Sequence, residues 1–298
     1  MTRYALVVTN AQTPAQAQQV VSACNFLRNN GFTLVFETEE ASRVNQLQTE
    51  SIVFEVFASQ DIEIGLVLGG DGSILRAAEL LRASDTPILG INLGHVGFMA
   101  EAEAKSMDET LELVVSRSYE VRERLALDVV VIESGQETFR SWALNEVTVE
   151  KSARERMLEV VIEVDSRPLS SFGCDGVLVS TPTGSTAYAF SAGGPVMWPN
   201  VEALMMIPLS AHALFSKPLV VGPKTQLAIE VLRRSAGSGV LWCDGRRTFD
   251  LGAGARVEVA QSAKSIPMVV LEDVPFADRL VKKFSLPVTG WRGPDSTK

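Results

Sequence analysis

The stretch that decides the fold is Ile64-Gly65-Leu66-Val67-Leu68-Gly69-Gly70-Asp71-Gly72-Ser73-Ile74-Leu75-Arg76. An apolar run typical of a buried parallel strand ends at two glycines, and a helical pattern begins after a single carboxylate. Glycines in such a turn let backbone N–H groups approach phosphate oxygens, and the N-terminus of the following helix adds partial positive charge. The stretch therefore predicts a strand, a phosphate-binding turn and a helix, with the ligand at the carboxyl end of the strand.

The carboxylate in this turn, Asp71, has two interpretations. A carboxylate repels phosphate, so its natural tasks here are to hold Mg²⁺ or to accept a proton from a hydroxyl nucleophile. Alternatively, Asp71 is the N-cap of an ordinary helix, a position that Asp and Ser fill often. The turn alone leaves both interpretations open.

Composition limits the class of protein. A chain of 298 residues is long enough for two domains with buried cores. The hydrophobic content of 46% and the mean hydropathy of +0.15 are those of a globular protein rather than a disordered one. The net charge of −9, without a block of Lys or Arg, argues against a nucleic-acid backbone or an anionic membrane as partner. A phosphate ligand must therefore be held by local glycines, helix termini and a few cations.

The sequence also indicates a compartment and limits metal chemistry. The apolar stretch within residues 1–10 is too short for a signal peptide, and no run approaches the ~18 apolar residues of a transmembrane helix. The three cysteines, odd in number and far apart, fit reduced thiols, so we expect a cytoplasmic protein. With only His95 and His212 present, no His/Cys metal cluster can be assembled.

The order of the predicted elements divides the chain into two halves. Strand and helix patterns alternate up to about residue 120, which predicts a parallel α/β sheet. From residue 125 the pattern changes to short runs separated by turn clusters, the last of them Met268 to Leu271, and this half is predicted to be all-β. One helical break, Ser185 to Ala192, interrupts it. We expect an N-terminal α/β domain over 1–121, an all-β domain over 122–275, and a closing helical segment over 276–298 that joins the first domain.

A second candidate site lies between strands of the β half, over residues 173–195. Small and hydroxyl residues dominate it, and the chain approaches a helix start. Thr186, Tyr188 and Ser191 can offer hydroxyl groups from one helical turn. The stretch either cradles a nucleotide or forms a tight polar corner of a β domain, and its residues alone do not decide between the two.

The motifs together are more specific than any one of them. They are Gly69-Gly70-Asp71-Gly72, Asn92-Leu93-Gly94-His95-Val96-Gly97-Phe98, Asn145-Glu146 and the stretch Gly173 to Pro195, in this order. Over nearly its whole length the sequence resembles the NAD kinase family, and its closing residues 284–291 resemble the actinobacterial branch. The resemblance implies transfer of the terminal phosphoryl group of ATP to the 2′-hydroxyl of the adenosine ribose of NAD, with inorganic polyphosphate left open as a second donor. It also implies Mg²⁺ with the nucleotide phosphates, an N-terminal α/β domain, a C-terminal β-sandwich and a homodimer or homotetramer.

The resemblance assigns roles residue by residue. Asp71 matches the family's proton acceptor, which faces the 2′-hydroxyl. Asn145 and Glu146 match the pair that hydrogen-bonds adenine and ribose, and Asp175 resembles a residue that reaches the nicotinamide side. Arg156 matches a polar or basic ligand position. The other matching positions surround the phosphates, the adenine and the adenosine: Gly70, Gly72, Arg76, Phe98, Thr183, Thr186, Ala187, Tyr188 and Ser191.

Some positions depart from the family's usual pattern or stay ambiguous. Lys217 stands where Arg is common, and Lys cannot reproduce a bidentate Arg contact. Arg246 stands where Gln is common, so the roles of both residues stay open. His212 is either a satisfied core histidine or a catalytic group. Arg156 is either a ligand-binding residue or a solvated surface arginine.

Other functions share parts of this pattern. A diacylglycerol-type lipid kinase or a 6-phosphofructokinase carries a similar glycine turn, but the motif Thr-Ile-Asp-Asn-Asp expected of the latter is absent. A non-catalytic dinucleotide sensor could keep the fold, although an intact Asp71 and Asn145-Glu146 pair argues against it. The sequence contains neither a Gly-x-Gly-x-x-Gly fingerprint nor a Gly-Lys-Ser/Thr phosphate loop. Among these alternatives the sequence favours a NAD kinase.

Overall fold

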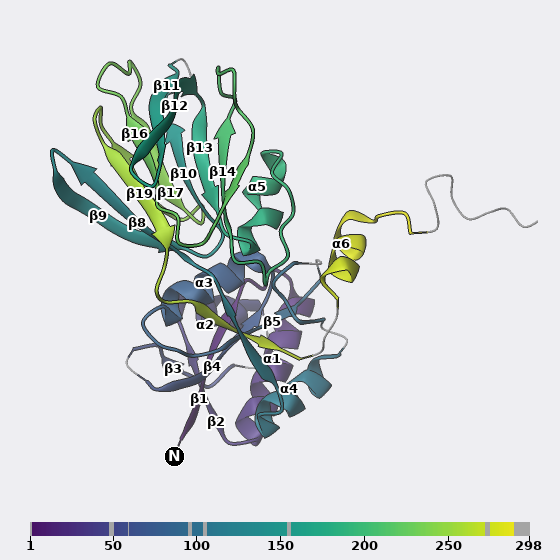
Figure 1. The fold of residues 1–298 in the computed structure, drawn as a ribbon. Helices are drawn as coiled ribbons and strands as arrows, with labels where there is room; N and C mark the ends of the chain where they lie inside the picture. Colours follow the sequence, from purple (N-terminus) through teal and green to yellow (C-terminus); the bar gives the residue numbers. More distant parts are fainter. Residues whose placement is uncertain are drawn as a thin grey trace, which may run out of the picture. The chain divides into compact units, whose positions relative to one another are not determined.

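The computed structural model of the chain describes residues 2–47, 51–58, 60–94, 97–103, 106–153, 156–271 and 275–288. The chain divides into two compact units, one made of Met1–Glu123 with Pro267–Lys298 and the other of Arg124–Ile266 (Figure 1). Each unit has a buried hydrophobic core of its own. Of the predicted closing segment 276–298, residues 289–298 lie outside the described part of the chain.

The first unit is an α/β fold, which consists of one sheet and five helices of the described chain. Its strands are β1 (Arg3–Thr9), β2 (Phe32–Phe36), β3 (Glu55–Val56), β4 (Ile62–Leu68), β5 (Ile88–Asn92), β6 (Ala102–Glu103), β7 (Glu120–Arg124) and β20 (Ile266–Val270). They lie in the order β3-β2-β1-β4-β5-β20-β7, with β6 beside β5. The helices are α1 (Pro14–Asn29), α2 (Thr38–Leu47), α3 (Asp71–Leu81), α4 (Met107–Ser116) and α6 (Phe276–Phe284). The pairs β1–β2, β1–β4 and β4–β5 are parallel, which confirms the predicted α/β half.

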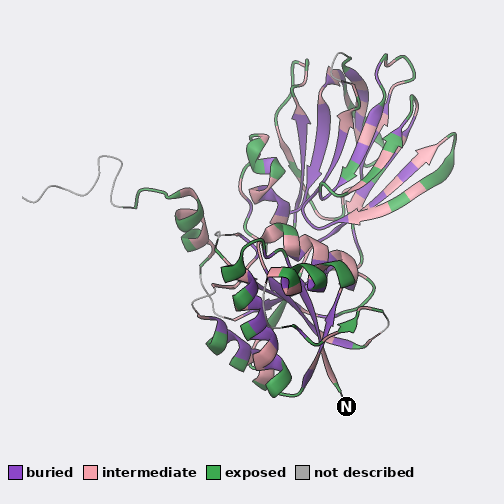
Figure 2. Cartoon of the chain, turned by 180° about the vertical axis from the view of Figure 1, so that it is seen from behind, coloured by how far each residue is buried: buried purple, intermediate pink, exposed green. Residues whose placement is uncertain are grey.

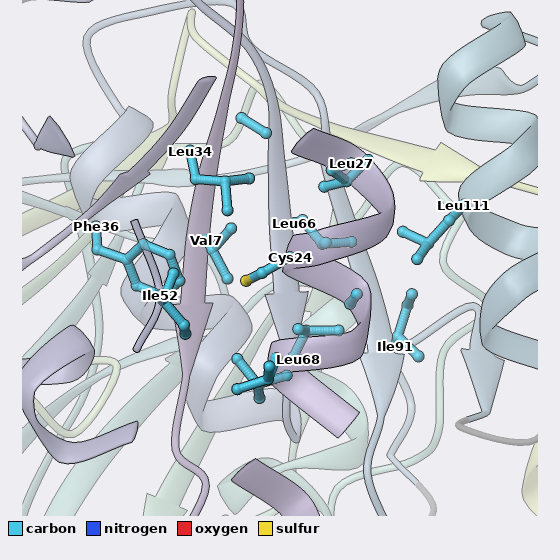
Figure 3. Close-up of a cluster of buried hydrophobic side chains, with 14 of the residues drawn as sticks. Val7, Cys24, Leu27, Leu34, Phe36, Ile52, Leu66, Leu68, Ile91 and Leu111 are labelled. Atoms are coloured by element: carbon cyan, nitrogen blue, oxygen red, sulfur yellow. The ribbon is translucent and has the colours of Figure 1, made fainter. Parts of the chain in front are cut away.

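Helix α1 shows how the local sequence sets the ends of an element. The Thr13 hydroxyl accepts a hydrogen bond from the N–H of Gln16 at 3.3 Å, and Pro14 is the first helical residue, where an N–H would lack a helical partner. At the other end Gly31 takes a φ of +86°, a conformation that favours glycine. The buried face of α1 packs on the sheet, where Figure 3 shows Cys24 and Leu27 beside Val7, Leu66 and Leu68.

One predicted strand belongs to the other half of the chain. We assigned the run Met268 to Leu271 to the all-β half, and this is wrong. Strand β20 lies in the first sheet, where Met268 pairs in parallel with Ile88 of β5. All residues of β20 are buried. A continuous apolar run does not alternate, so its pattern cannot tell a buried parallel strand from a strand of a sandwich core.

The second unit consists of two antiparallel sheets. The strand orders are β15-β14-β13-β10-β17-β18 and β12-β11-β16-β19-β8-β9. The strands of the first sheet are β10 (Glu146–Lys151), β13 (Gly176–Ser180), β14 (Leu204–Leu209), β15 (Leu219–Val221), β17 (Gly239–Cys243) and β18 (Arg247–Leu251). Those of the second are β8 (Leu127–Glu133), β9 (Gln136–Ala143), β11 (Leu158–Val164), β12 (Arg167–Cys174), β16 (Leu227–Val231) and β19 (Arg256–Gln261). Side chains from both sheets form one buried cluster, which confirms the expected β-sandwich.

The helical break in the sandwich is shorter than predicted. Over Ser185 to Ala192 we expected one helix. The chain instead forms a 3₁₀ turn, η2 (Thr183–Thr186), followed by the short helix α5 (Tyr188–Ser191). Ala189 of α5 packs with Leu178 of β13 and Met205 of β14 in a smaller cluster. The break is therefore anchored on the sheet that carries β10.

Two further observations concern the cysteines and the helices. Cys24, Cys174 and Cys243 are buried free thiols. Across the described ranges, no helix combines the length and the apolar character that a membrane span requires.

Helix α6 has no buried residue. All of its residues are described, and Figure 2 shows them in the exposed and intermediate colours.

Candidate functional site

The turn after β4 has the predicted form. Strand β4 ends at Leu68, and α3 begins at Asp71. Gly70 is the N-cap, with an extended backbone (φ −95°, ψ −171°), and Asp71 is the first helical residue. The interpretation of Asp71 as an ordinary N-cap is therefore wrong, and its carboxylate has other partners.

The carboxylate of Asp71 is held by the loop that follows β5. Oδ2 accepts a hydrogen bond from the N–H of Phe98, and Oδ1 accepts one from the N–H of Met99, each at 3.1 Å. Gly97 makes this approach possible, since a Cβ there would lie 2.4 Å from Asp71 Oδ1. A carboxylate has lone pairs beyond those that two donors use. Asp71 is thus fixed in direction and able to accept a further hydrogen bond. His95 and Val96 of the same motif lie outside the described residues.

The glycines of the turn leave room for a ligand. A Cβ built on Gly70 or Gly72 would meet no described atom within 4 Å, whereas one on Gly69 would meet Ser73 Oγ at 2.7 Å. The first N–H groups of a helix have no carbonyl partner within the helix. Open space beside such N–H groups, at the positive end of α3, fits a phosphate group.

Arg76, a predicted phosphate ligand, lies one turn further along α3. It donates to Glu37 in a bidentate pair at 2.5 to 2.9 Å and to Glu79 at 3.3 Å. A guanidinium has five N–H donors, so these bonds do not use all of them. Any contact of Arg76 with a phosphate would be shared with two carboxylates.

Phe98, predicted to lie beside the adenine, is packed against the C-terminal helix. Its ring centroid lies 6.1 Å from that of Phe276 and 5.7 Å from that of Phe284, both on α6. Phe98 is 9% exposed. In this structure α6 therefore covers most of the residue.

In the second unit, Asn145 and Glu146 lie at the start of β10, where a buried carboxylate holds their backbone. Asp244, between β17 and β18, accepts hydrogen bonds from the N–H groups of Leu144 at 2.9 Å, Asn145 at 2.7 Å and Glu146 at 3.3 Å. It also accepts one from Arg247 at 2.9 Å. Asp244 is 7% exposed. A residue 100 positions away from Leu144 thus sets the position of the predicted binding pair.

The side chains of this pair carry buried oxygen atoms without a protein partner. Asn145 Oδ1 and Glu146 Oε2 are buried, and no group in the described part of the chain bonds to either. An unpaired buried polar group costs roughly 1–3 kcal/mol, so such atoms call for an explanation, and a ligand is one. Burial, and after it the charge of Asp244, raises the pKa of Glu146 to about 8. A raised pKa of this kind is typical of a functional site.

The segment after β13 is locked to the start of β10. Thr181 Oγ1 donates to the carbonyl of Leu144 at 2.6 Å, and the Thr181 N–H donates to the carbonyl of Asn145 at 2.9 Å. Gly184 lies so close that a Cβ there would be 2.1 Å from the same Asn145 oxygen. These contacts bring the predicted nucleotide cradle next to Asn145.

The predicted residues of this cradle form two groups. Three are half-buried, in or just after η2, and two are exposed on α5: Thr183, Thr186 and Ala187, then Tyr188 and Ser191. The backbone N–H of Tyr188 lies toward the carboxylate of Glu146 and lowers the pKa of that group, and the Tyr188 hydroxyl lies toward Glu150. The cradle therefore meets the Asn145–Glu146 pair at Tyr188.

Asp175 and Arg156 have partners of their own. Asp175, between β12 and β13, pairs with Lys151 Nζ at 2.5 Å, and this hydrogen bond lowers the pKa of Asp175. Arg156 is exposed and donates through Nη1 to the carbonyl of Ala236 at 2.8 Å. That bond does not connect Arg156 to the other predicted site residues.

Sequence reasoning missed two residues that shape these groups. Gly97 belongs to the motif Asn92 to Phe98 but was not singled out, and Asp244, two residues before Arg246, was not among the predicted site residues. An Asp-Gly dipeptide is a turn signal, and Asp244 does take a φ of +52°. His212 is exposed, and its backbone N–H donates to the carbonyl of Gly173 at 2.8 Å. The interpretation of His212 as a core histidine is therefore wrong.

Glu146→Gln is expected to change how stability depends on pH. The folded-state pKa of Glu146, about 8, lies above its ordinary value of 4.5, so between these values the folded protein holds a proton that the unfolded chain releases. The free energy of unfolding of the wild type therefore falls as the pH rises through this range. Glutamine has no such proton, so the free energy of unfolding of the variant should fall less between pH 5 and pH 8 than that of the wild type. Urea unfolding of both proteins at pH 5 and pH 8 measures this, and identical pH dependence in the two would contradict it.

The fold and the two groups of residues define a class of protein. An α/β unit with a glycine-rich turn and a fixed aspartate, and a β-sandwich with a polar cradle, are the parts of a nucleotide-dependent phosphotransferase. Residues 6–119 match the ATP-NAD kinase N-terminal domain, and residues 144–271 match the ATP-NAD kinase C-terminal domain. The chain belongs to the NAD kinase family, as the resemblance of its motifs predicted.

Individual relatives and solved structures agree with this assignment. The NAD kinase of Leifsonia xyli subsp. xyli is 53% identical over 98% of this chain and 98% of its own. NAD kinase 2 of Streptomyces coelicolor is 59% identical over 78% of this chain and 76% of its own. The crystal structure of yeast NADH kinase complexed with NADH has a TM-score of 0.87 and covers 99% of this chain and 90% of its own, at 21% identity, so it supports the fold alone. An NAD kinase from Archaeoglobus fulgidus in complex with ATP has a TM-score of 0.70 at 25% identity, over 95% of this chain and 98% of its own.

Family membership decides between the functions considered from the sequence. The chain is an enzyme that transfers the terminal phosphoryl group of ATP to the 2′-hydroxyl of the adenosine ribose of NAD. The lipid kinase, the 6-phosphofructokinase and the non-catalytic sensor are thereby set aside.

Proposed function

We propose that Asp71 accepts the proton of the 2′-hydroxyl as its oxygen attacks the terminal phosphorus of ATP. The observation that carries this is the Asp71 carboxylate, fixed by two backbone N–H groups at 3.1 Å beside a turn whose glycines face open space. In the step, the bond from O2′ to phosphorus forms, the bond from phosphorus to the bridging oxygen of ADP breaks, and the proton moves to Asp71. The N–H groups of the turn, with Gly70 and Gly72, hold the phosphates and stabilise the charge that develops on them.

We propose that Asn145 and Glu146 bind the adenosine of NAD. Asn145 Oδ1 is a buried acceptor, and Glu146 Oε2 is one when its carboxyl group is ionised; adenosine offers the matching donors, an exocyclic amino group and ribose hydroxyls. A ligand that donates to these atoms removes the cost of leaving them unpaired. The Asn145–Glu146 pair should therefore prefer a ligand that carries an amino group and hydroxyl groups, as adenosine does.

The remaining predicted residues complete the proposed site. Thr183, Thr186, Ala187, Tyr188 and Ser191 form the adenosine cradle, Phe98 contributes to the adenine site, and Arg76 lies toward the phosphates. Asp175 reaches the nicotinamide side, and Arg156 is a further polar or basic ligand. Support is strongest for the cradle, because Gly184 and Tyr188 contact the Asn145–Glu146 pair.

We propose that Mg²⁺ enters with the phosphates of the donor. Among the described residues, no group of three or more His, Cys, Asp or Glu side chains is placed to hold a metal ion. Mg²⁺ in phosphoryl-transfer enzymes generally keeps several waters and is held largely by substrate phosphates, so the phosphates of ATP would supply its main ligands here. When bound, the ion would neutralise phosphate charge.

The state of assembly, the cellular compartment and the use of inorganic polyphosphate as a second phosphoryl donor are also proposals. We infer a homodimer or homotetramer, supported by large exposed apolar residues of the sandwich such as Leu214, Phe215 and Val220. A cytoplasmic location agrees with the three buried free thiols. Light scattering of the purified protein measures the assembly, and a monomer at micromolar concentration would contradict it.

A coupled assay of NADP⁺ formation tests the proposal as a whole. NAD⁺ or NADH is offered with ATP or polyphosphate, with and without Mg²⁺, and Asp71→Asn is the control. We expect NADP⁺ from NAD⁺ and ATP that depends on both Mg²⁺ and Asp71. If Asp71→Asn forms NADP⁺ as fast as the wild type, Asp71 is not the proton acceptor. If NADP⁺ forms without a divalent cation, the reaction does not need Mg²⁺.

A further inference from the structure

The C-terminal helix α6 contacts the loop that holds Asp71. Arg279, in the middle of α6, donates through Nη1 to the carbonyl oxygens of Phe98 at 3.2 Å and Ala100 at 3.4 Å, and through Nη2 to Glu101 at 2.7 Å. The side chains of Arg279 and Glu101 are 15% and 3% exposed. Charge-assisted bonds shielded from water in this way are stronger than those of an exposed ion pair. Arg279 is therefore able to fix the course of the loop.

One peptide group links Arg279 to Asp71. The carbonyl of Phe98 accepts from Arg279, and the N–H of the same peptide group, that of Met99, donates to Asp71 Oδ1 at 3.1 Å. Because a peptide group is planar, the direction of its carbonyl sets the direction of its N–H. Hydrogen bonds in a chain also polarise one another, so a guanidinium on the carbonyl strengthens the N–H as a donor.

The far end of the loop is anchored on β5. The N–H of Glu101 donates to the carbonyl of Gly90 at 2.9 Å. A Cβ on Gly90 would lie 3.1 Å from Cα of Ala100, so glycine lets the loop lie close to the strand. The loop is thus attached to Asp71 at one end and to β5 at the other, and Arg279 bonds to the segment between them.

We propose that Arg279 is a positioning residue for phosphoryl transfer, which orients the Asp71 carboxylate through the Phe98–Met99 peptide group. The inference rests on the role proposed for Asp71. The hydrogen bonds of Arg279 described above all go to the loop, at Phe98, Ala100 and Glu101. A misdirected proton acceptor slows the chemical step and leaves the contacts of Asn145 and Glu146 with the nucleotide unchanged. Loss of Arg279 should therefore lower kcat without a matching change in KM for NAD.

Steady-state kinetics of three variants test the proposal. Arg279→Gln is expected to lower kcat by about tenfold, with KM for NAD within about twofold of the wild type. Arg279→Lys keeps the charge but not the planar fork, so it should recover part of the loss. Lys282→Met is the matched control, because Lys282 makes another α6 contact, with Glu103, and touches neither Phe98 nor Met99. Its kcat should stay within about twofold of the wild type. Equal losses in Arg279→Gln and Lys282→Met would overturn the proposal, since docking of α6 alone would then explain them.

A double-mutant cycle with Asp71→Asn separates this inference from the proposed function. If Arg279 acts through Asp71, adding Arg279→Gln to Asp71→Asn should change the residual rate by less than about twofold. A further tenfold loss, roughly that of the single variant, would overturn the inference and leave the role of Asp71 intact. Near-wild-type turnover of Asp71→Asn alone would overturn the proposed function, and the inference with it.

Hydrogen exchange of the loop gives a readout that does not depend on turnover. The amides of Phe98 and Met99 are bonded to Asp71. They should exchange roughly tenfold faster in Arg279→Gln than in the wild type, and at the wild-type rate in Lys282→Met. Unchanged exchange in Arg279→Gln would show that Arg279 does not hold the loop, and the proposal would fail.

Discussion

Asp71→Asn is expected to lower kcat by about 10²- to 10⁴-fold while NAD binding persists. The amide oxygen of asparagine can still accept a hydrogen bond from the N–H of Phe98 or of Met99, so the side chain keeps part of its attachment. An amide cannot accept the proton of the 2′-hydroxyl, so the loss falls on the chemical step. The lower limit reflects a loose transition state, in which the nucleophile gives up its proton late and the base contributes modestly. Initial rates of NADP⁺ formation at saturating ATP give kcat, and calorimetric titration with NAD gives the dissociation constant.

The control for this variant is Asp108→Asn. Asp108 lies in the first turn of α4, as Asp71 lies in the first turn of α3, and it is exposed. Removing it takes the same charge from a helix N-terminus without disturbing the loop after β5. Its kcat should stay within about twofold of the wild type. A rate for Asp71→Asn close to that of Asp108→Asn would show that Asp71 is not the proton acceptor.

The parts of the site that depend on neighbouring residues were predictable from the sequence. The turn from Gly69 to Gly72 follows from an apolar run, two glycines and a helix start, all within a few residues. The helix of Thr13 and Pro14 was predictable for the same reason, because its cap bonds to Gln16, three residues on. The β-sandwich itself was expected only as all-β from the alternation of its runs, and the sandwich arrangement came from the resemblance to a family.

The parts that depend on distant residues were not predictable. The partners of Asp71, Phe98 and Met99, lie 27 and 28 positions away, and those of Asp244 lie up to 100 positions away. No local pattern encodes which backbone N–H groups a carboxylate will reach, since that follows from the packing of whole strands. The assignment of β20 to the all-β half was wrong for a related reason. An apolar run shows that a segment is buried but does not show in which sheet it lies.

Asp244→Asn is expected to lower the free energy of unfolding by about 2–4 kcal/mol. Oδ1 of Asp244 accepts from Asn145 and Glu146, and Oδ2 accepts from Leu144 and Arg247. Whichever position the amide nitrogen takes, it faces two donors that then lack an acceptor, at about 1–3 kcal/mol each. Chemical denaturation at pH 7 measures the difference from the wild type.

The same variant should weaken NAD binding, because Asp244 holds the backbone of both binding residues. Glu146→Gln changes one acceptor, whereas Asp244→Asn displaces Asn145 and Glu146 together, so KM for NAD should rise by about tenfold. Asp250→Asn, at an exposed position of β18, is the matched control and should stay within about 0.5 kcal/mol of the wild type. If Asp244→Asn is as stable as Asp250→Asn, the Asp244 carboxylate is not what holds the start of β10. A lowered stability with unchanged KM would instead show that the start of β10 keeps its position without Asp244, and that Asn145 and Glu146 are placed by the contacts of Thr181 and Gly184.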